Sequence, residues 1–146
     1  MKKYVLTLSV IICSLCAIAQ TSDEEAIKKV VTSAYIEGIQ NNGPVEDIRK
    51  GIHPAFVMIR IIDNEVKPFP IEEWITAIEK RRKEAKPDDK PVRTEGKFIS
   101  VDVTGTVAVV KLELSREGKK TFTDYIVLNK FNEGWRLVTK DFYRHP

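Results

Sequence analysis

The stretch from Lys97 to Phe142 constrains the fold most, because it reads as four consecutive strands joined by tight turns. Apolar and polar residues alternate along it, with many β-branched and aromatic side chains, which is typical of half-buried strands. Each break carries a glycine, where a hairpin turn requires a positive φ. Turns this short force neighbouring strands to pair antiparallel, so the stretch predicts a meander. The expected strands are Lys97–Thr104, Thr106–Arg116, Lys120–Phe131 and Trp135–Phe142.

The hairpins also predict which side chains share a face of the sheet. Placing Arg116 opposite Lys119 puts Lys111 opposite Asp124, and the last hairpin is registered in the same way. One face is then nearly all hydrophobic, and we expect it to pack on helices. This expected inner face holds Ile99, Val101, Val103, Ala108, Val110, Leu112, Leu114, Tyr125, Val127, Trp135 and Leu137.

The second face is apolar at its centre but carries opposite charges at cross-strand spacing. A solvent-facing surface would not need so many hydrophobic side chains, so we interpret this face as an interface. The residues expected in that interface are Val109, Lys111, Asp124, Ile126, Leu128, Val138, Lys140 and Phe142.

Three charged residues of that face, Lys111, Asp124 and Lys140, allow two interpretations. In the first, a charge network sets the register of two copies across the interface. In the second, Asp124 is a catalytic carboxylate held between two cations. Flanking cations would lower the pKa of that carboxyl group and make it a poor base, so we favour the first interpretation.

The N-terminus predicts an export signal. A basic start at Lys2 and Lys3 is followed by an apolar run, which ends at Ala17-Ile18-Ala19 with the small residues that a signal peptidase reads. The apolar run is too short to span a membrane comfortably, and a polar domain follows at once. We therefore expect residues 1–19 to be removed and residues 20–146 to form one domain that is periplasmic or secreted and has no membrane association.

Composition excludes several classes of function. Both cysteines lie in the leader, so the mature chain would have no disulfide, thiol nucleophile or thiolate metal site. Loss of Lys2 and Lys3 leaves 22 basic against 21 acidic residues, a balance that gives no reason to expect nucleic-acid binding. No two histidines have metal-ligand spacing, so we expect no metal and no cofactor.

The first half of the chain predicts helices that cover the sheet. Ser22 opens a capping box, and apolar residues recur at helical spacing until Asn41-Asn42-Gly43. A second short helix over 45–52, a strand pair over 57–69 and a third helix from Ile71 follow. The order predicts an α+β domain with helices on one face of a strongly curved sheet, a shape that leaves a concave cavity.

In this order, the elements resemble the nuclear-transport-factor-2-like superfamily, a cone-shaped, cystatin-like α+β barrel that includes polyketide-cyclase-like proteins. More narrowly, the chain is similar to a branch named putative lumazine-binding. The segments that carry the resemblance include residues 26–31, 53–56, 100–105, 108–114, 122–128 and 134–142. The resemblance implies the fold, a cavity and a homodimer through the outer sheet face; function follows from it only loosely, because this fold hosts isomerases, cyclases, dehydratases and binding modules.

The candidate cavity residues are aromatic or polar side chains and one methionine, expected near the mouth or on inward-facing positions. The resemblance to isomerases of this superfamily implies that Tyr35 could act as an oxyanion donor, and His53 is a candidate general base. Arg60 is informative because a charge on an apolar face needs an anionic partner. The candidates are Tyr35, His53, Phe56, Met58, Arg60, Trp74, Tyr125 and Trp135.

Three functions remain open at this point. The first is a binding module whose cavity takes a small apolar or aromatic molecule, which we favour over an enzyme. The second is an isomerase or dehydratase that uses His53 or Tyr35. The third is a protein-interaction domain with a collapsed cavity.

Overall fold

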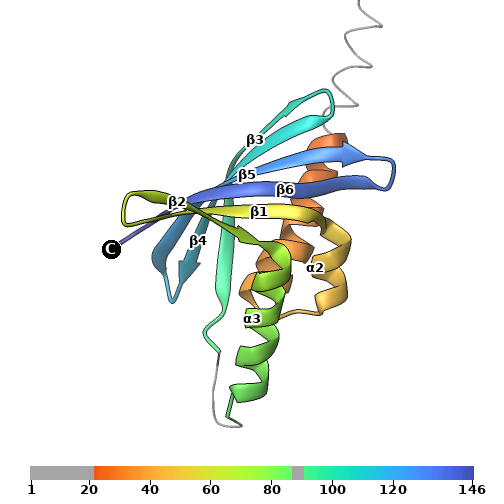
Figure 1. The fold of residues 1–146 in the computed structure, drawn as a ribbon. Helices are drawn as coiled ribbons and strands as arrows, with labels where there is room; N and C mark the ends of the chain where they lie inside the picture. Colours follow the sequence, from red (N-terminus) through yellow and green to blue (C-terminus); the bar gives the residue numbers. More distant parts are fainter. Residues whose placement is uncertain (1–21, 87–90) are drawn as a thin grey trace, which may run out of the picture.

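The computed structural model describes residues 22–86 and 91–146 as three helical segments packed on a six-stranded mixed sheet. Figure 1 shows a sheet that curves and does not close, with the helices gathered on one side of it. This architecture confirms the expected α+β class. The predicted leader, residues 1–19, lies outside the described residues.

The first helix covers the sheet through one apolar face. Residues 22–30 are α-helical and continue directly into η1 (Val31–Gln40), a π-helix. The backbone N–H of Asn41 bonds to the carbonyl of Ile36, five residues earlier, and the helix ends there as the Asn-Asn-Gly sequence predicts. Its buried face includes Ile27, Val31 and Tyr35, as the helical spacing indicates.

Two shorter helices complete the cover. Pro44 precedes α2 (Val45–Gly51), and Pro70 precedes α3 (Ile71–Glu84), each with acidic residues in its first turn, where they complement the helix dipole. The two helices bury isoleucines against the core. Among the described residues, none of the helices is both long and apolar enough to cross a membrane.

The sheet follows the predicted meander and extends it by a hairpin. Its strands are β1 (Ile52–Ile62), β2 (Glu65–Pro70), β3 (Thr94–Thr104), β4 (Val107–Arg116), β5 (Lys119–Phe131) and β6 (Gly134–Arg144). Their spatial order is β2-β1-β6-β5-β4-β3. The β1–β6 pair is parallel and all other pairs are antiparallel.

The face assignment of β5 predicted above is wrong. Arg116 does lie opposite Lys119, but a bulge between Leu114 and Ser115 shifts the rest of the pairing by one residue, so that Leu112 lies opposite Asp124. Because strand side chains alternate, a one-residue shift moves every later side chain to the other face. Three expected interface residues on β5 are therefore fully buried under the helices: Asp124, Ile126 and Leu128.

The same shift turns the two expected inner residues of β5 outward. Tyr125 is 46% exposed and Val127 is half-buried. Ile99 is also exposed, because β3 has its own irregularity between Phe98 and Ser100. Val110, by contrast, is fully buried on the inner face, so the orientation of β4 is as predicted.

A second bulge explains why β6 departs from simple alternation. The pairing shifts between Val127 and Leu128, and Val138 has no partner in the β5–β6 register. The bulge allows residues on both sides of it to be buried: Trp135 and Leu137 before it, and Lys140 after it. Lys140 and Phe142, both predicted in the dimer interface, thus belong to the interior side.

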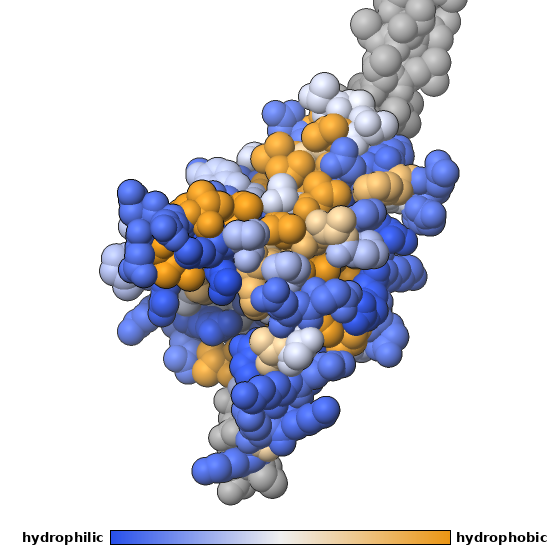
Figure 2. All heavy atoms as spheres, viewed as in Figure 1, coloured by the Kyte–Doolittle hydropathy of each residue, from blue (hydrophilic) through white to orange (hydrophobic). Residues whose placement is uncertain are grey.

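The outer face of the sheet keeps several exposed hydrophobic side chains. Val109 and Tyr125 are nearly half exposed, and Lys111 pairs with Tyr125 across β4 and β5. Figure 2 shows hydrophobic surface over the strands, interrupted by hydrophilic residues. Of the eight predicted interface residues, Val109 and Lys111 keep their outward position.

Candidate functional site

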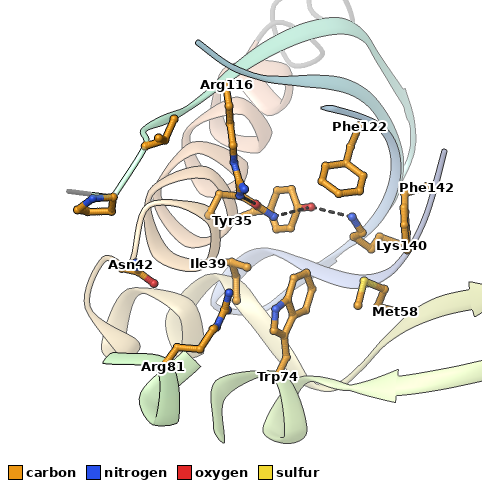
Figure 3. Close-up of a pocket in the computed structure, with 13 residues that line it drawn as sticks. Tyr35, Ile39, Asn42, Met58, Trp74, Arg81, Arg116, Phe122, Lys140 and Phe142 are labelled. Carbon is orange, nitrogen blue, oxygen red and sulfur yellow. Dashed lines mark hydrogen bonds between the residues drawn. The ribbon is translucent and has the colours of Figure 1, made fainter. Parts of the chain in front are cut away.

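A cavity of about 450 Å³ lies between η1, α3 and the inner side of the sheet (Figure 3). Apolar and aromatic side chains form most of its inner wall, and polar side chains stand at its margin. Its inner wall includes Tyr35, Met58, Trp74, Phe122, Lys140 and Phe142. A volume of this size is in the range of small-molecule sites.

A buried hydrogen-bonded network forms the floor of this cavity. The hydroxyl of Tyr35 donates to Oδ2 of Asp124 at 2.6 Å. Nζ of Lys140 donates to Oδ1 of Asp124 at 2.6 Å and to the Tyr35 hydroxyl at 2.7 Å. Asp124 is fully buried and is not among the residues that line the cavity, so it stands behind Tyr35 and Lys140.

Sheet register and helix geometry bring these groups together. Ile126 pairs with Lys140 and Asp124 pairs with Phe142, so Asp124 and Lys140 are diagonal neighbours on the inner face. Tyr35 reaches them from η1. Gln40, five residues after Tyr35, donates from Nε2 to the same hydroxyl at 3.1 Å. Short π-helical segments in proteins occur frequently at functional sites.

Burial governs the ionisation of the network. Desolvation raises the pKa of Tyr35 well above 10.0, and the neighbouring Asp124 carboxylate adds to the effect. The Tyr35 hydroxyl therefore stays protonated. Desolvation also lowers the pKa of Lys140 from 10.5, against the opposing attraction of Asp124.

Aromatic rings surround the Lys140 amine. Its Nζ lies 4.7 Å from the Phe142 ring centroid, 5.0 Å from that of Tyr35 and 5.9 Å from that of Trp74. The Tyr35 and Trp74 rings meet edge to face at 6.1 Å. The floor of the cavity thus offers one polar atom set among ring surfaces.

The margin of the cavity is positively charged. Arg116 donates from Nε to Thr94 Oγ1 at 2.8 Å and from a terminal guanidinium nitrogen to Gln40 Oε1 at 3.4 Å. Arg81 approaches from the far end of α3. No carboxylate is among the described residues that line the cavity. This charge distribution favours a ligand with an anionic or electron-rich group.

Three of the eight candidate cavity residues line this cavity: Tyr35, Met58 and Trp74. Phe56 is fully buried beside it, with its ring centroid 6.4 Å from that of Trp74. Tyr125 lies on the outer face and is not in the cavity, because of the β5 register shift.

The other three candidates lie elsewhere. His53 stacks on Phe131 at 4.8 Å, and its Nδ1 accepts from the backbone N–H of Ala55. Trp135 is buried and donates to Asp23 at 3.0 Å. The Arg60 guanidinium covers the Phe69 ring at 4.2 Å, so it packs on an aromatic face within the β1–β2 hairpin.

The sequence did not predict that the two charged residues Asp124 and Lys140 belong to the floor of the cavity. It predicted them on the other face of the sheet. The sequence contains a signal for the correct face. Ile126 and Leu128 are larger aliphatic residues than their neighbour Val127, which favours the buried face for them, and Asp124 lies on the same face of β5 because strand side chains alternate. Among the described residues, no group of His, Cys, Asp and Glu could hold a metal ion.

The fold and cavity together define a nuclear-transport-factor-2-like protein. An NTF2-like protein of unknown function from Shewanella baltica OS155 has a similar structure, with a TM-score of 0.68 and 22% identity over 86% of this chain and 96% of that one. A cystatin-like domain from Nostoc punctiforme PCC 73102 has a TM-score of 0.62 and 18% identity, over 86% and 79%. These likenesses show the fold.

Sequence comparison gives the family. Residues 22–143 match the family described as "Putative lumazine-binding", and the chain belongs to that family. It is also similar to the aldolase FrzH of Cladobotryum sp., with 24% identity over 127 residues that cover 86% of this chain and 95% of the relative.

Proposed function

We propose that this chain is an exported protein that binds a small molecule in the cavity between η1, α3 and the sheet. The observation that carries the proposal is the polar floor of Tyr35 and Lys140 under walls of aromatic rings. Membership of the family supports small-molecule binding. The ligand would combine a flat or apolar body with one hydrogen-bond acceptor.

Each part of that ligand has a partner in the cavity. Trp74, Phe122 and Phe142 offer ring surfaces to an apolar or aromatic body. The Lys140 amine offers a polar anchor at the floor, and Arg116 offers a second one at the margin. A neutral aliphatic molecule would make no polar contact with either side chain, so a ligand with an acceptor or anionic group is expected.

Tryptophan fluorescence tests the binding proposal. The chain has two tryptophans, and Trp135 does not line the cavity, so a Trp135→Phe variant leaves Trp74 as the reporter. Phenylpyruvate, phenylacetate and a free pterin are suitable probes, because each combines a flat ring with acceptors. Saturable quenching of Trp74 fluorescence is expected for at least one probe. A flat response to all of them would count against a cavity for aromatic ligands.

Export is part of the proposal, supported by the leader pattern of residues 1–19. Expression in a Gram-negative bacterium followed by cell fractionation and intact mass measurement tests it. The expected product begins at Gln20 and is found outside the cytoplasm. Retention of the full chain in the cytoplasm would overturn the export claim.

We also propose a homodimer through the outer face of the sheet, supported by its exposed hydrophobic side chains. Val109 and Tyr125 supply apolar area there, and Lys111 lies among them. The inward residues Asp124, Ile126 and Leu128 take no part. Mass measured by light scattering distinguishes one copy from two.

A second candidate function is catalysis at the same floor. The relative named as an aldolase supports it, as does a buried network of tyrosine, carboxylate and amine beside a cavity. An oxyanion donor role for Tyr35 fits less well, because its hydrogen is already donated to Asp124. Release of aldehyde from hydroxy-carbonyl compounds is the assay, and no release above a Lys140→Met control would exclude it.

A further inference from the structure

Lys140 is a buried primary amine that also lines the cavity. Its residue is 4% exposed, and Nζ is held at 2.6 Å from Asp124 and 2.7 Å from the Tyr35 hydroxyl. We propose that Nζ of Lys140 forms a Schiff base with the carbonyl carbon of a small aromatic 2-oxo acid or related ketone bound in the cavity. The inference rests on the binding function proposed above.

The hydrogen bonds orient the nitrogen for attack. A neutral amine has two hydrogens and one lone pair around a tetrahedral nitrogen. The two hydrogens have acceptors in Asp124 Oδ1 and the Tyr35 hydroxyl. The lone pair then takes a remaining direction of the tetrahedron, away from those two oxygens. Because Asp124 stands behind the amine and does not line the cavity, a carbonyl carbon can approach from the cavity side.

Burial of Lys140 favours the neutral amine needed for attack. Burial lowers its pKa, while Asp124 on β5 and the adjacent Asp141 on β6 oppose that effect. Tyr35 on η1 stays protonated, and the Trp74 side chain on α3 carries no charge. A lysine amine desolvated in this way is the usual form of a lysine nucleophile.

The same neighbours can carry the protons of the reaction. The lone pair of Nζ forms a bond to the carbonyl carbon, and the carbon–oxygen π pair moves to oxygen. That oxygen takes a proton released from the nitrogen and becomes the hydroxyl of a carbinolamine. The remaining proton of the former amine, relayed through Asp124 or the Tyr35 hydroxyl, reaches this hydroxyl, which leaves as water. The nitrogen electron pair then forms the C=N bond. One amine and one ketone thus give one imine and one water.

The cavity also selects the carbonyl compound. The aromatic rings of Trp74 and Phe142 flank the amine at 4.7–5.9 Å, so a ring attached near the carbonyl has surfaces to pack on. Arg116 at the margin can pair with a carboxylate. Phenylpyruvate combines the ring, the ketone and the carboxylate in one molecule, and phenylacetate keeps the ring and carboxylate but lacks the ketone.

Reductive trapping tests the proposal. The full-length mature protein is incubated with phenylpyruvate and borohydride, which reduces an imine to a stable secondary amine, and the adduct is located by peptide mass mapping. We expect Lys140 to be labelled in clear preference to the outer-face Lys111, because of the two only Lys140 lines the cavity that would hold the ketone. Labelling should be lost with phenylacetate and in Lys140→Arg. Equal labelling of the two lysines, or none on Lys140, would overturn the proposal.

The wild-type mapping does not depend on any variant folding, so it decides by itself. Trp74 fluorescence, measured with phenylpyruvate in the Trp135→Phe variant, separates the two proposals. Quenching by phenylpyruvate without an adduct on Lys140 refutes the Schiff base and leaves the binding function standing. Absence of both quenching and adduct refutes the site for this class of ligand.

Discussion

The hydroxyl of Tyr35 donates a 2.6 Å hydrogen bond to Asp124, which lies 89 residues further along the chain. This bond joins the covering helix to the centre of the sheet. Lys140 donates to both partners, so a hydroxyl, a carboxylate and an amine form one closed group. Several consequences for stability, pH dependence and assembly can be measured.

Loss of the carboxylate is expected to be costly. Asp124→Asn leaves the buried Lys140 amine without its anionic partner, and removing one member of a buried pair typically costs about 3–5 kcal/mol of the free energy of unfolding. Urea unfolding measures the cost. Asp102→Asn, at an exposed outer-face position, is the matched control and should change stability by less than about 0.5 kcal/mol. An equal loss of stability in the two variants would contradict the claim that Asp124 and Lys140 form a buried ion pair.

Removal of the Tyr35 hydroxyl should have a smaller effect. Tyr35→Phe keeps the ring against Trp74 but leaves the Asp124 carboxylate short of one donor, a loss of about 1–3 kcal/mol. Tyr125→Phe on the outer face removes a hydroxyl of the same kind from an exposed ring. The difference between the two variants in urea unfolding gives the contribution of the buried Tyr35 hydroxyl to the free energy of unfolding. Equal stability of Tyr35→Phe and Tyr125→Phe would show that this hydroxyl makes no contribution.

The stability of the fold should depend on pH through Lys140. Because burial lowers its pKa below 10.5, the folded chain loses this proton at a lower pH than the unfolded chain. The unfolded state then binds more protons in that window, so the free energy of unfolding contributed by Lys140 rises as pH rises toward 10.5. The raised pKa of Tyr35 acts in the opposite sense above pH 10.0, since the unfolded tyrosine ionises there first.

The two effects can be separated experimentally. Unfolding is measured from roughly pH 8 to pH 9, where a tyrosine with an ordinary pKa near 10 is still mostly protonated. Wild type should gain stability relative to Lys140→Met over this range, and Lys111→Met should follow wild type. Parallel curves for wild type and Lys140→Met would contradict the lowered pKa.

The outer face offers a test of assembly. Tyr125→Asp should yield a monomer without unfolding, because this side chain is 46% exposed on one copy. Ile126→Asp, one residue away on the opposite face, should instead unfold the protein, because a charge would replace a fully buried side chain. Light scattering and circular dichroism measure the two outcomes. A folded Ile126→Asp monomer would show that the β5 register is the one first predicted.

Local patterns in the sequence predict most of the fold. The glycine-marked turns, the helical stripe up to Ile39 and the proline before Ile71 each mark an element that the structure has in that place. The inner face of β4 follows from its alternation. These features depend on residues close together in the chain, so a single sequence reveals them.

The site could not be derived in the same way, because it depends on two bulges. The bulge after Leu114 turns β5 over, and the one beside Val138 lets Trp135 and Lys140 face the same side. No glycine or proline stands at either position to mark it. The sequence therefore placed Asp124 and Lys140 in an interface, although the large aliphatic residues Ile126 and Leu128 indicate the inward face of β5.

Alanine variants of Phe56 and Trp74 should differ in stability, because Phe56 belongs to the core and Trp74 to the cavity wall. Phe56→Ala should cost about 3–5 kcal/mol of the free energy of unfolding, because the ring is fully buried. Trp74 is half-buried and lines the cavity, so Trp74→Ala should cost less and should weaken ligand binding. Urea unfolding and a binding assay on both variants check this, and a larger stability loss for Trp74→Ala would place that ring in the core.

The central claim is that the space above Tyr35 and Lys140 holds a small molecule. Native mass spectrometry of the protein purified from its own host tests it most directly, with Phe122→Trp to fill the cavity and Tyr143→Trp on the outer face as the control. We predict a bound small molecule in wild type and Tyr143→Trp that is absent from Phe122→Trp. A compound retained equally by all three proteins, or by none of them, would contradict the account.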